Sequence, residues 1–314
     1  MLINFLVIVA LLVLFYFLGK AADLTITNVK IVADKLGIKI FFIGIILGFI
    51  TTLPEMAVGI NALMSDLPAI TLGNLFGGIM VLLGLILGVN LILHRKIETD
   101  GDIKNFAPIV GYLFLPLILS LDGKLSFWDG VIIIIAYLSV IYYLYLQQKH
   151  LALHVDVETG EKKNLKYLFL ILVGIVSVII ISDLIIRVAE IILDQLAIPA
   201  FILGLLVFAI GTNLPEITLA LKSWRRKVKD LSMSNLLGSS MSNMLLLGVF
   251  ATFKTFNVNL NFSFFLFFFF LAVLACLLVV FYKTGKEFSR KEGFVLLLVY
   301  GLFVIVELFF LMFY

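Results

Sequence analysis

The sequence predicts an all-α polytopic membrane protein whose ten transmembrane helices form two inverted-topology repeats of five. Three observations lead to this fold class: the composition, the placement of the basic residues and an internal repeat. Of the 314 residues, 63% are hydrophobic and 14% are charged, against roughly 45–50% and about 25% in an ordinary soluble domain. One globular core cannot bury this excess, so we expect most of it to face lipid.

Ten apolar stretches divide the chain. Each is close to the ~20 residues that a helix needs to cross the hydrocarbon layer, except the fourth, which is short. The expected helices are residues 2–19, 38–63, 70–93, 106–121, 127–147, 165–193, 199–221, 231–252, 260–282 and 293–313. The first stretch lacks a basic segment and a small-residue cleavage site, so we expect a retained helix rather than a signal peptide.

The basic residues alternate between the connections. The odd-numbered connections hold 20 of the 23 Lys and Arg residues, whereas the even-numbered ones hold only Lys124 and Lys254. Cytoplasmic loops are enriched in Lys and Arg. The split therefore predicts that both termini lie outside the cytoplasm, in a multi-pass protein of the cell membrane.

An internal repeat becomes visible when the sequence is shifted by 161 residues. The shift places Thr51-Thr52-Leu53-Pro54-Glu55 on Thr212-Asn213-Leu214-Pro215-Glu216, and Asn74-Leu75-Phe76-Gly77 on Asn235-Leu236-Leu237-Gly238. Upstream, Asp23-Leu24 matches Asp183-Leu184 at a shift of 160. We therefore expect one repeat over 1–147, a cytoplasmic linker over 148–164 and a second repeat over 165–314. Five helices per repeat force the second repeat to enter from the opposite side, an arrangement typical of secondary transporters with a midplane site.

The chemistry concentrates in the twin Thr-x-Leu-Pro-Glu segments. Proline removes a backbone donor inside a helix, which frees carbonyls near Ile50 and Gly211. Each proline is followed by a glutamate, Glu55 or Glu216, in an otherwise apolar stretch. A lone carboxylate at this depth is costly. Two facing carboxylates with nearby hydroxyl and carbonyl oxygens predict a shared hard cation: Ca²⁺, Na⁺ or H⁺.

The third and eighth helices are expected to form the other wall of the site. Ser239 and Asn243 lie four residues apart on one helix face, whereas the first repeat has Gly78 and Leu82 there. Three glycine pairs are expected to allow close helix packing: Gly44/Gly48, Gly73/Gly77 and Gly84/Gly88.

Two other groups of charged residues receive structural interpretations. Asp183 and Arg187 have the spacing of a salt bridge on one helix face. Glu307 lies seven residues from the C-terminus and is expected to reach the surface by snorkelling.

Several function classes are excluded by composition and motif content. Cys276 is the single cysteine and the formal charge is +3, which argues against a disulfide framework, a CxxC site and a nucleic-acid surface. The sequence has no Ser-His-Asp set, nucleotide-binding loop or His-rich metal motif. We therefore expect neither an enzyme nor a resident cofactor.

These residues carry a family resemblance. Thr-[Ser/Thr]-Leu-Pro-Glu, followed about 20 residues later by Gly-Asn-x-x-Gly-Ser and then Asn or Asp, in inverted halves of five helices, resembles the calcium/cation antiporter superfamily, particularly prokaryotic sodium/calcium exchangers. The specific motifs cover about 48–84 and 209–249. The resemblance implies that Glu55 and Glu216 coordinate Ca²⁺. It also implies two flanking sodium sites, one from Thr51, Thr52 and the Gly48 carbonyl, the other from Thr212, Asn213, Ser239 and the Ala209 carbonyl.

The chain departs from the family pattern mainly in its first half. Ile50 stands where the family has Gly, and Gly78 and Leu82 stand where it has Ser and Asn. In the second half Asn213 replaces Ser, Ser234 replaces Gly and Asn243 replaces the Asp of many members. Two carboxylates neutralise one divalent or two monovalent cations. A third Na⁺ would add an unbalanced charge in a medium of low dielectric constant, so we expect fewer than three coupling Na⁺ ions, or protons in their place.

The function expected from these features is exchange of Ca²⁺ for Na⁺ or H⁺ by alternating access at a central two-glutamate site. The partners would be inorganic cations and the lipid bilayer, with a monomer sufficient for transport. Three alternatives stay open: an antiporter for another cation with altered coupling, a cation channel, and a non-transporting homologue.

Overall fold

The computed structural model describes residues 2–35, 51–94, 96–98, 103–147, 164–196, 198–217, 233–284 and 287–313. Helices account for most of these residues. In chain order they are α1 (Leu2–Lys35), α3 (Leu53–Met64), α4 (Pro68–Met80), the π-helix η1 (Val81–Ile86), α5 (Leu87–His94), α6 (Ile103–Leu119), the short η2 (Ser120–Asp122), α7 (Phe127–Gln147), α8 (Asn164–Leu196), α9 (Ala200–Ile202), the π-helix η4 (Leu203–Phe208), α10 (Ala209–Thr212), α12 (Met233–Phe253), α13 (Phe262–Thr284) and α14 (Arg290–Phe313).

Among the described residues, seven helices are long and apolar enough to cross a membrane. Three further predicted spans correspond to the shorter apolar helices Leu53–Met64, Phe106–Asp122 and Ala200–Thr212. The expected end of the first span at residue 19 is wrong, because α1 continues to Lys35 as one helix of 34 residues. No proline or glycine follows Gly19 within that helix, so nothing in the backbone stops it at the polar residues.

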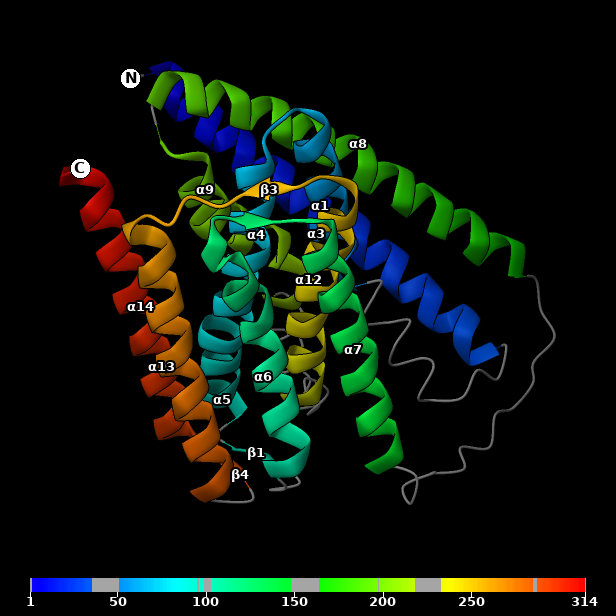
Figure 1. Cartoon of the computed structure of the whole chain (residues 1–314). Coiled ribbons are helices and arrows are strands. Elements are labelled where there is room, and N and C mark those ends of the chain that lie inside the picture. The colour runs from blue at the N-terminus through cyan, green and yellow to red at the C-terminus, as the bar shows by residue number, and fades with distance from the viewer. Residues whose placement is uncertain are drawn as a thin grey trace.

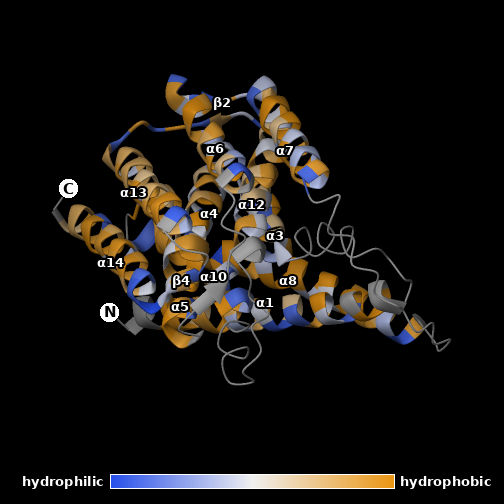
Figure 2. Cartoon of the chain, turned by 90° about the horizontal axis from the view of Figure 1, so that it is seen from below, coloured by the Kyte–Doolittle hydropathy of each residue, from blue (hydrophilic) through white to orange (hydrophobic). Residues whose placement is uncertain are grey.

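The two longest helices form a layer of their own. In Figure 1, α1 and α8 lie side by side and cross the remaining helices at a steep angle. The others run more nearly parallel, with α4 and α12 inside and the pairs α6/α7 and α13/α14 outside. Figure 2 shows that hydrophobic residues make up most of the length of the helices, as a membrane-spanning protein requires.

Two short antiparallel sheets link segments that are distant in sequence. Strand β1 (Lys96–Glu98) pairs with β4 (Glu287–Ser289), and β2 (Lys124–Leu125) pairs with β3 (Phe256–Asn257). Figure 1 places β1 and β4 at one end of the bundle and β3 at the other. By the repeat shift, β1 corresponds to β3 and β2 corresponds to β4, so the two sheets are equivalent. The pairing therefore supports a two-fold relation between the halves.

Glycines bring the inner helices into close contact, as the sequence predicts for Gly73/Gly77 and Gly84/Gly88; Gly44/Gly48 lies outside the described residues. A Cβ on Gly73 or Gly77 of α4 would overlap the carbonyl oxygens of Phe201 and Leu205, and a Cβ on Gly204 would overlap that of Ile70. Gly84 and Gly88 likewise pack against α14. These contacts fix α4 against the segment that leads into the second Thr-x-Leu-Pro-Glu motif.

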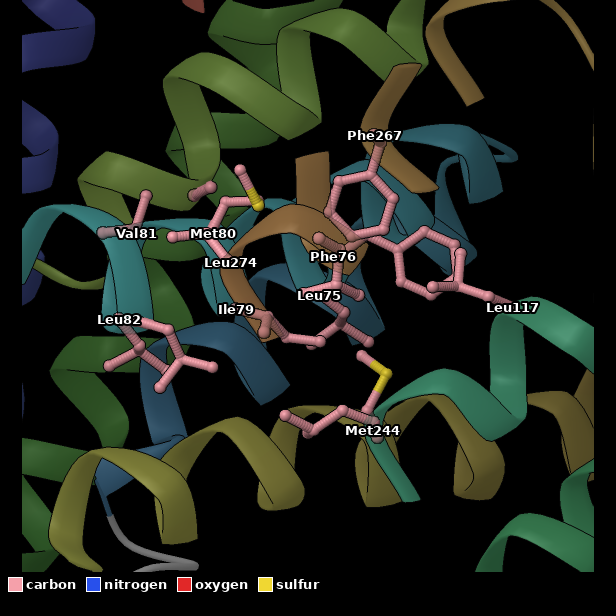
Figure 3. Close-up of a cluster of buried hydrophobic side chains, with 14 of the residues drawn as sticks. Leu75, Phe76, Ile79, Met80, Val81, Leu82, Leu117, Met244, Phe267 and Leu274 are labelled. Carbon is pink, nitrogen blue, oxygen red and sulfur yellow. The ribbon is translucent and has the colours of Figure 1, made fainter. Parts of the chain in front are cut away.

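A large apolar cluster surrounds α4 and η1. Figure 3 shows Phe76, Leu82, Met244 and Phe267 packed together with their neighbours. Leu82 is fully buried in this cluster. It contributes packing and no oxygen ligand, which agrees with the expectation that the first-repeat wall lacks donors at this position.

Two structural expectations about charged residues have opposite outcomes. The salt bridge on α8 is confirmed, since Arg187 Nε lies 2.8 Å from Asp183 Oδ2. The expectation for Glu307 is wrong, because its side chain is fully buried rather than exposed. It lies on the α13-facing side of α14 within reach of Ser263, which is also buried. Helix packing covers the position before the side chain can reach the surface.

Candidate functional site

The backbone turns in the same way at both Thr-x-Leu-Pro-Glu segments. Thr52 has φ −89° and ψ 11°, and Asn213 has φ −88° and ψ 12°. The next hydrogen bonds also match, with Met56 N–H donating to the Thr52 carbonyl at 2.9 Å and Ile217 N–H to the Asn213 carbonyl at 3.1 Å. Each helix is interrupted at Thr52 or Asn213 and restarts at the following leucine, with the proline, which cannot donate, in the first turn. The halves thus present their glutamates on equivalent backbones.

Glu55 and Glu216 lie close together inside the protein. Their exposed fractions are 1% and 5%, and the two carboxylates interact electrostatically. Oε2 of each glutamate has no hydrogen-bond partner among the described residues. Two like charges in this setting repel each other unless a cation lies between them.

Thr212 connects the two halves at the site. Its hydroxyl bonds to the Phe208 carbonyl and to Asn74 Oδ1, each at 3.1 Å, and it lies within reach of the Glu55 carboxylate. Sequence reasoning did not include Asn74 among the ligands. The signal was present, because Asn74 begins the motif that the 161-residue shift matches to Asn235.

Two asparagine side chains of the second half meet at Gly78 of the first. A Cβ on Gly78 would overlap Nδ2 of Asn243 and lie 3.5 Å from Nδ2 of Asn213. Asn213 Nδ2 also donates to the Ala209 carbonyl at 2.9 Å. The missing side chain at Gly78 therefore leaves room for the Asn243 amide, and the Ala209 carbonyl already accepts one hydrogen bond.

The remaining predicted ligands are divided between described and undescribed residues. Ser239 is 3% exposed and lies one turn before Asn243 on α12. Thr52 is buried and Thr51 is half-buried, and both have interaction partners. The Gly48 carbonyl and Ile50 lie outside the described residues. The structure thus places the second-repeat candidates together more fully than those of the first.

Most of the unsatisfied buried polar atoms of the candidate ligands are oxygens. Among the described residues, Glu55 Oε2, Glu216 Oε2, Ser239 Oγ and Asn243 Oδ1 are buried without a hydrogen-bond donor. Each such atom costs about 1–3 kcal/mol. Carboxylate, hydroxyl and amide oxygens are the ligands that Ca²⁺ and Na⁺ prefer. Binding a hard cation here would offset this cost.

Comparison with known proteins identifies the family of the chain. The family model described as "Sodium/calcium exchanger protein" matches residues 6–146 and 166–309, which cover both halves and both glutamate segments. The chain belongs to the sodium/calcium exchanger family. It is thus a membrane transport protein of the calcium/cation antiporter superfamily, a group of transporters rather than enzymes.

Similar proteins of this family span nearly the whole chain. Sodium/calcium exchanger MaX1 of Methanosarcina acetivorans is 24% identical, covering 97% of this chain and 98% of its own. Uncharacterized membrane protein MJ0091 of Methanocaldococcus jannaschii is 26% identical, over 92% and 93%. Among solved structures, the sodium-calcium exchanger NCX_Mj soaked with Na⁺ and Sr²⁺ has a TM-score of 0.67 at 22% identity, over 96% and 98%. The H⁺/Ca²⁺ exchanger CAX has a TM-score of 0.72 at 16% identity, over 96% and 86%. These structural likenesses establish the shared fold.

Proposed function

We propose that this protein exchanges Ca²⁺ for Na⁺ or H⁺ across the cell membrane, with both termini outside the cytoplasm. Ca²⁺ would bind between Glu55 and Glu216, one from each five-helix repeat. The single observation that carries the proposal is the buried carboxylate pair, in which Oε2 of each glutamate has no hydrogen-bond partner among the described residues. Two carboxylates balance the charge of one Ca²⁺, which makes that ion the best match to the site.

The same charge balance limits the coupling ions. Asn243 and Leu82 add no negative charge, and the amide nitrogens of Asn213 and Asn243 lie near Gly78. A third monovalent cation would therefore have no compensating charge in the central shell. We propose that fewer than three Na⁺ ions, or protons, replace each Ca²⁺.

Alternating access is supported by a difference between the two long helices. In the second half, Phe15 packs on Phe208 with ring centroids 5.3 Å apart, and a Cβ on Gly19 would lie 3.6 Å from Leu214 Cβ. The repeat shifts of 160 and 161 residues turn the Gly19–Leu214 contact into a contact between Ile179 of α8 and Leu53. Continued along the two helices, the same register would place residue 186 beside Asn61. Instead, Asn61 Nδ2 donates to Ser182 Oγ at 2.6 Å and lies 3.5 Å from the Ile179 carbonyl.

The contacts of α8 are thus displaced by four to seven residues from those of α1, or roughly 6–10 Å at about 1.5 Å per residue. In an inverted repeat, the two halves exchange conformations when access switches. When access switches, α1 would take the register that α8 has now, and α8 would take that of α1. This change moves α1 and α8 in the same direction, as one body, along α3 and the 208–217 segment. We propose that this slide opens the site to one side and then the other.

The test is uptake of ⁴⁵Ca²⁺ into proteoliposomes loaded with Na⁺ or held at a proton gradient. Wild type should take up Ca²⁺ only when one of these gradients is present. Removing either glutamate charge, in Glu55→Gln or Glu216→Gln, should lower the rate by at least about 100-fold, since a buried cation would lose half of its compensating charge. Glu190→Gln, on an exposed part of α8, is the matched control and should retain the wild-type rate.

Other outcomes distinguish the alternatives. Exchange that survives in both glutamine variants would refute the two-glutamate site. Steady unitary currents without a gradient requirement would indicate a channel. One net positive charge moved per Ca²⁺ would indicate three coupling Na⁺ ions and overturn the limit on coupling.

A further inference from the structure

Two aspartates occupy equivalent places in the long helices. Asp23 of α1 and Asp183 of α8 match at the repeat shift of 160, and neither belongs to the central site described above. If the halves had the same arrangement, the two aspartates would have equivalent surroundings. Their surroundings differ.

Asp23 lies beside the second-half glutamate. The contacts of α1 advance one turn at a time along 208–217: Phe15 meets Phe208 and Gly19 meets Leu214 and Pro215, the latter at 3.7 Å from a Cβ on Gly19 to Pro215 Cδ. Asp23 is the next residue on this face, one turn after Gly19. It is half-buried and interacts electrostatically with Glu216.

Asp183 lies away from the first-half glutamate. Its side chain is 47% exposed and forms the 2.8 Å salt bridge with Arg187. The adjoining Ser182 bonds to Asn61, which lies beyond Glu55 toward the C-terminal end of α3. The displaced register of α8 therefore keeps Asp183 from the place beside Glu55 that Asp23 has beside Glu216.

We propose that Asp23 and Asp183 are alternating relay carboxylates for the transported cation. Asp23 meets the cation beside Glu216 in this conformation, and Asp183 meets it beside Glu55 after α1 and α8 have slid. This inference rests on the proposed function. The independent sign of a ligand here is Glu216, 5% exposed with Oε2 unpartnered among the described residues. The ligand is a hard cation, Ca²⁺ or Na⁺, because carboxylate oxygens on both sides suit it.

The slide gives the relay its direction. The contacts of Phe15 and Gly19 run parallel to 208–217, so Asp23 lies on the side of Glu216 that faces the C-terminal end of α1. Because the repeats are inverted, Asp183 serves the opposite side. Arg187 holds Asp183 while it is away from the site and releases it when the register changes.

The experiment measures the Ca²⁺ concentration for half-maximal ⁴⁵Ca²⁺ uptake separately from each face of oriented proteoliposomes. Asp23→Asn should raise it about tenfold on the face reached by the C-terminal end of α1, and Asp183→Asn about tenfold on the other face. This is the effect of one unit charge near a cation at moderate dielectric. Each variant should change the opposite face by less than about twofold, and Asp23→Glu should restore the wild-type value.

The outcomes separate this inference from the proposed function. Equal effects of the aspartate variants on both faces, or no effect, overturn the relay. Loss of exchange in Glu216→Gln in the same experiment would still support the proposed function. A change in the charge moved per Ca²⁺ in Asp23→Asn also overturns it, because Asp23 would then belong to the coupling shell. If Asp23→Asn does not yield a monodisperse protein, Asp23→Ser in the same assay serves as the second variant. Uptake that survives Glu216→Gln refutes the proposed function itself.

Discussion

The two halves of the candidate site have the same backbone at their glutamate segments and different side chains at the wall positions. Thr52 and Asn213 share their dihedral angles to within a degree or two, and each glutamate follows its proline in the same way. The wall positions differ, with Gly78 and Leu82 in the first half and Ser239 and Asn243 in the second. The comparison indicates that symmetry is kept where the chain must break its helices and is relaxed where ligands set the ion count.

The largest expected effect comes from cross-linking α1 to the 208–217 segment, so that α1 cannot change its position along that segment. Gly19→Cys with Leu214→Cys, in a Cys276→Ala background, places two Cβ atoms about 3.6 Å apart, within the range for a disulfide. Oxidation should abolish ⁴⁵Ca²⁺ exchange and reduction should restore it, because α1 can no longer slide. Exchange at the wild-type rate in the fully cross-linked protein would contradict the sliding register.

A second, smaller effect is expected from filling the gap in the first-half wall. Gly78→Ala adds a Cβ that displaces the Asn243 amide. It should weaken Ca²⁺ binding by about tenfold, equivalent to about 1.4 kcal/mol, which is within the usual cost of overpacking.

Gly238→Ala on α12 is the matched control. A Cβ there meets none of the described residues within 4 Å, so titration calorimetry should show binding within about twofold of wild type, since no described neighbour is overpacked. The double variant Gly78→Ala with Asn243→Ala should relieve the overlap. If Gly78→Ala binds as tightly as Gly238→Ala, the close fit at Gly78 has no functional role.

A moderate effect is expected from adding charge to the second-half wall. Asn243→Asp adds a third buried carboxylate to the candidate site, at the position that faces Gly78. To balance it, the protein should carry one further monovalent cation per cycle. Reversal-potential measurements in proteoliposomes should therefore show a changed charge per Ca²⁺. An unchanged stoichiometry would place residue 243 outside the ion-binding shell.

The smallest effect is expected far from the site, where Lys254 at the end of α12 joins the turn after α3. Lys254 Nζ lies 2.5 Å from Asp66 Oδ1 and also donates to the Leu63 carbonyl. The hydrogen bond from Lys254 lowers the pKa of Asp66, a fully exposed side chain. Its stabilising contribution is therefore present above the unfolded-state pKa and is lost as pH falls through the lower folded-state value.

Lys254→Met should lower thermal stability slightly at neutral pH, and the difference from wild type should vanish in acid. Exchange activity should be close to wild type. A thermal shift that persists at the lowest pH would mean that the Lys254 stem, rather than its charge, makes the contribution.

Much of the fold could be predicted because the hydrophobicity and glycine spacing of each segment determine where its helix lies. Apolar stretches gave the helix positions, with α7 matching its expected span over 127–147, and Gly73 and Gly77 gave the close approach of α4. The glutamate segments could be found because duplication repeats a motif that chance does not. Their backbone equivalence then follows from the shared Leu-Pro-Glu sequence.

The errors concern contacts between distant segments. Nothing near residue 19 reveals that α1 continues to Lys35, because the polar residues beyond it include ones such as Thr25 that pack against α8 at Gly174 instead of ending the helix. Glu307 could not be known to be buried before the packing of α13 against α14 was known. The Thr212–Asn74 bond and the fit of Asn243 at Gly78 join opposite halves. The internal repeat marks Asn74 as a motif residue, but it does not say which side chain of the other half Asn74 meets.

The two small sheets have a consequence for assembly. Each fastens a hairpin of one half to a hairpin of the other, at opposite ends of the bundle. A protease cut between α7 and α8 would therefore yield two polypeptides that stay clasped together, and the two pieces expressed from separate genes should reassemble. The strand pairs would then hold the two halves together without the covalent connection between α7 and α8.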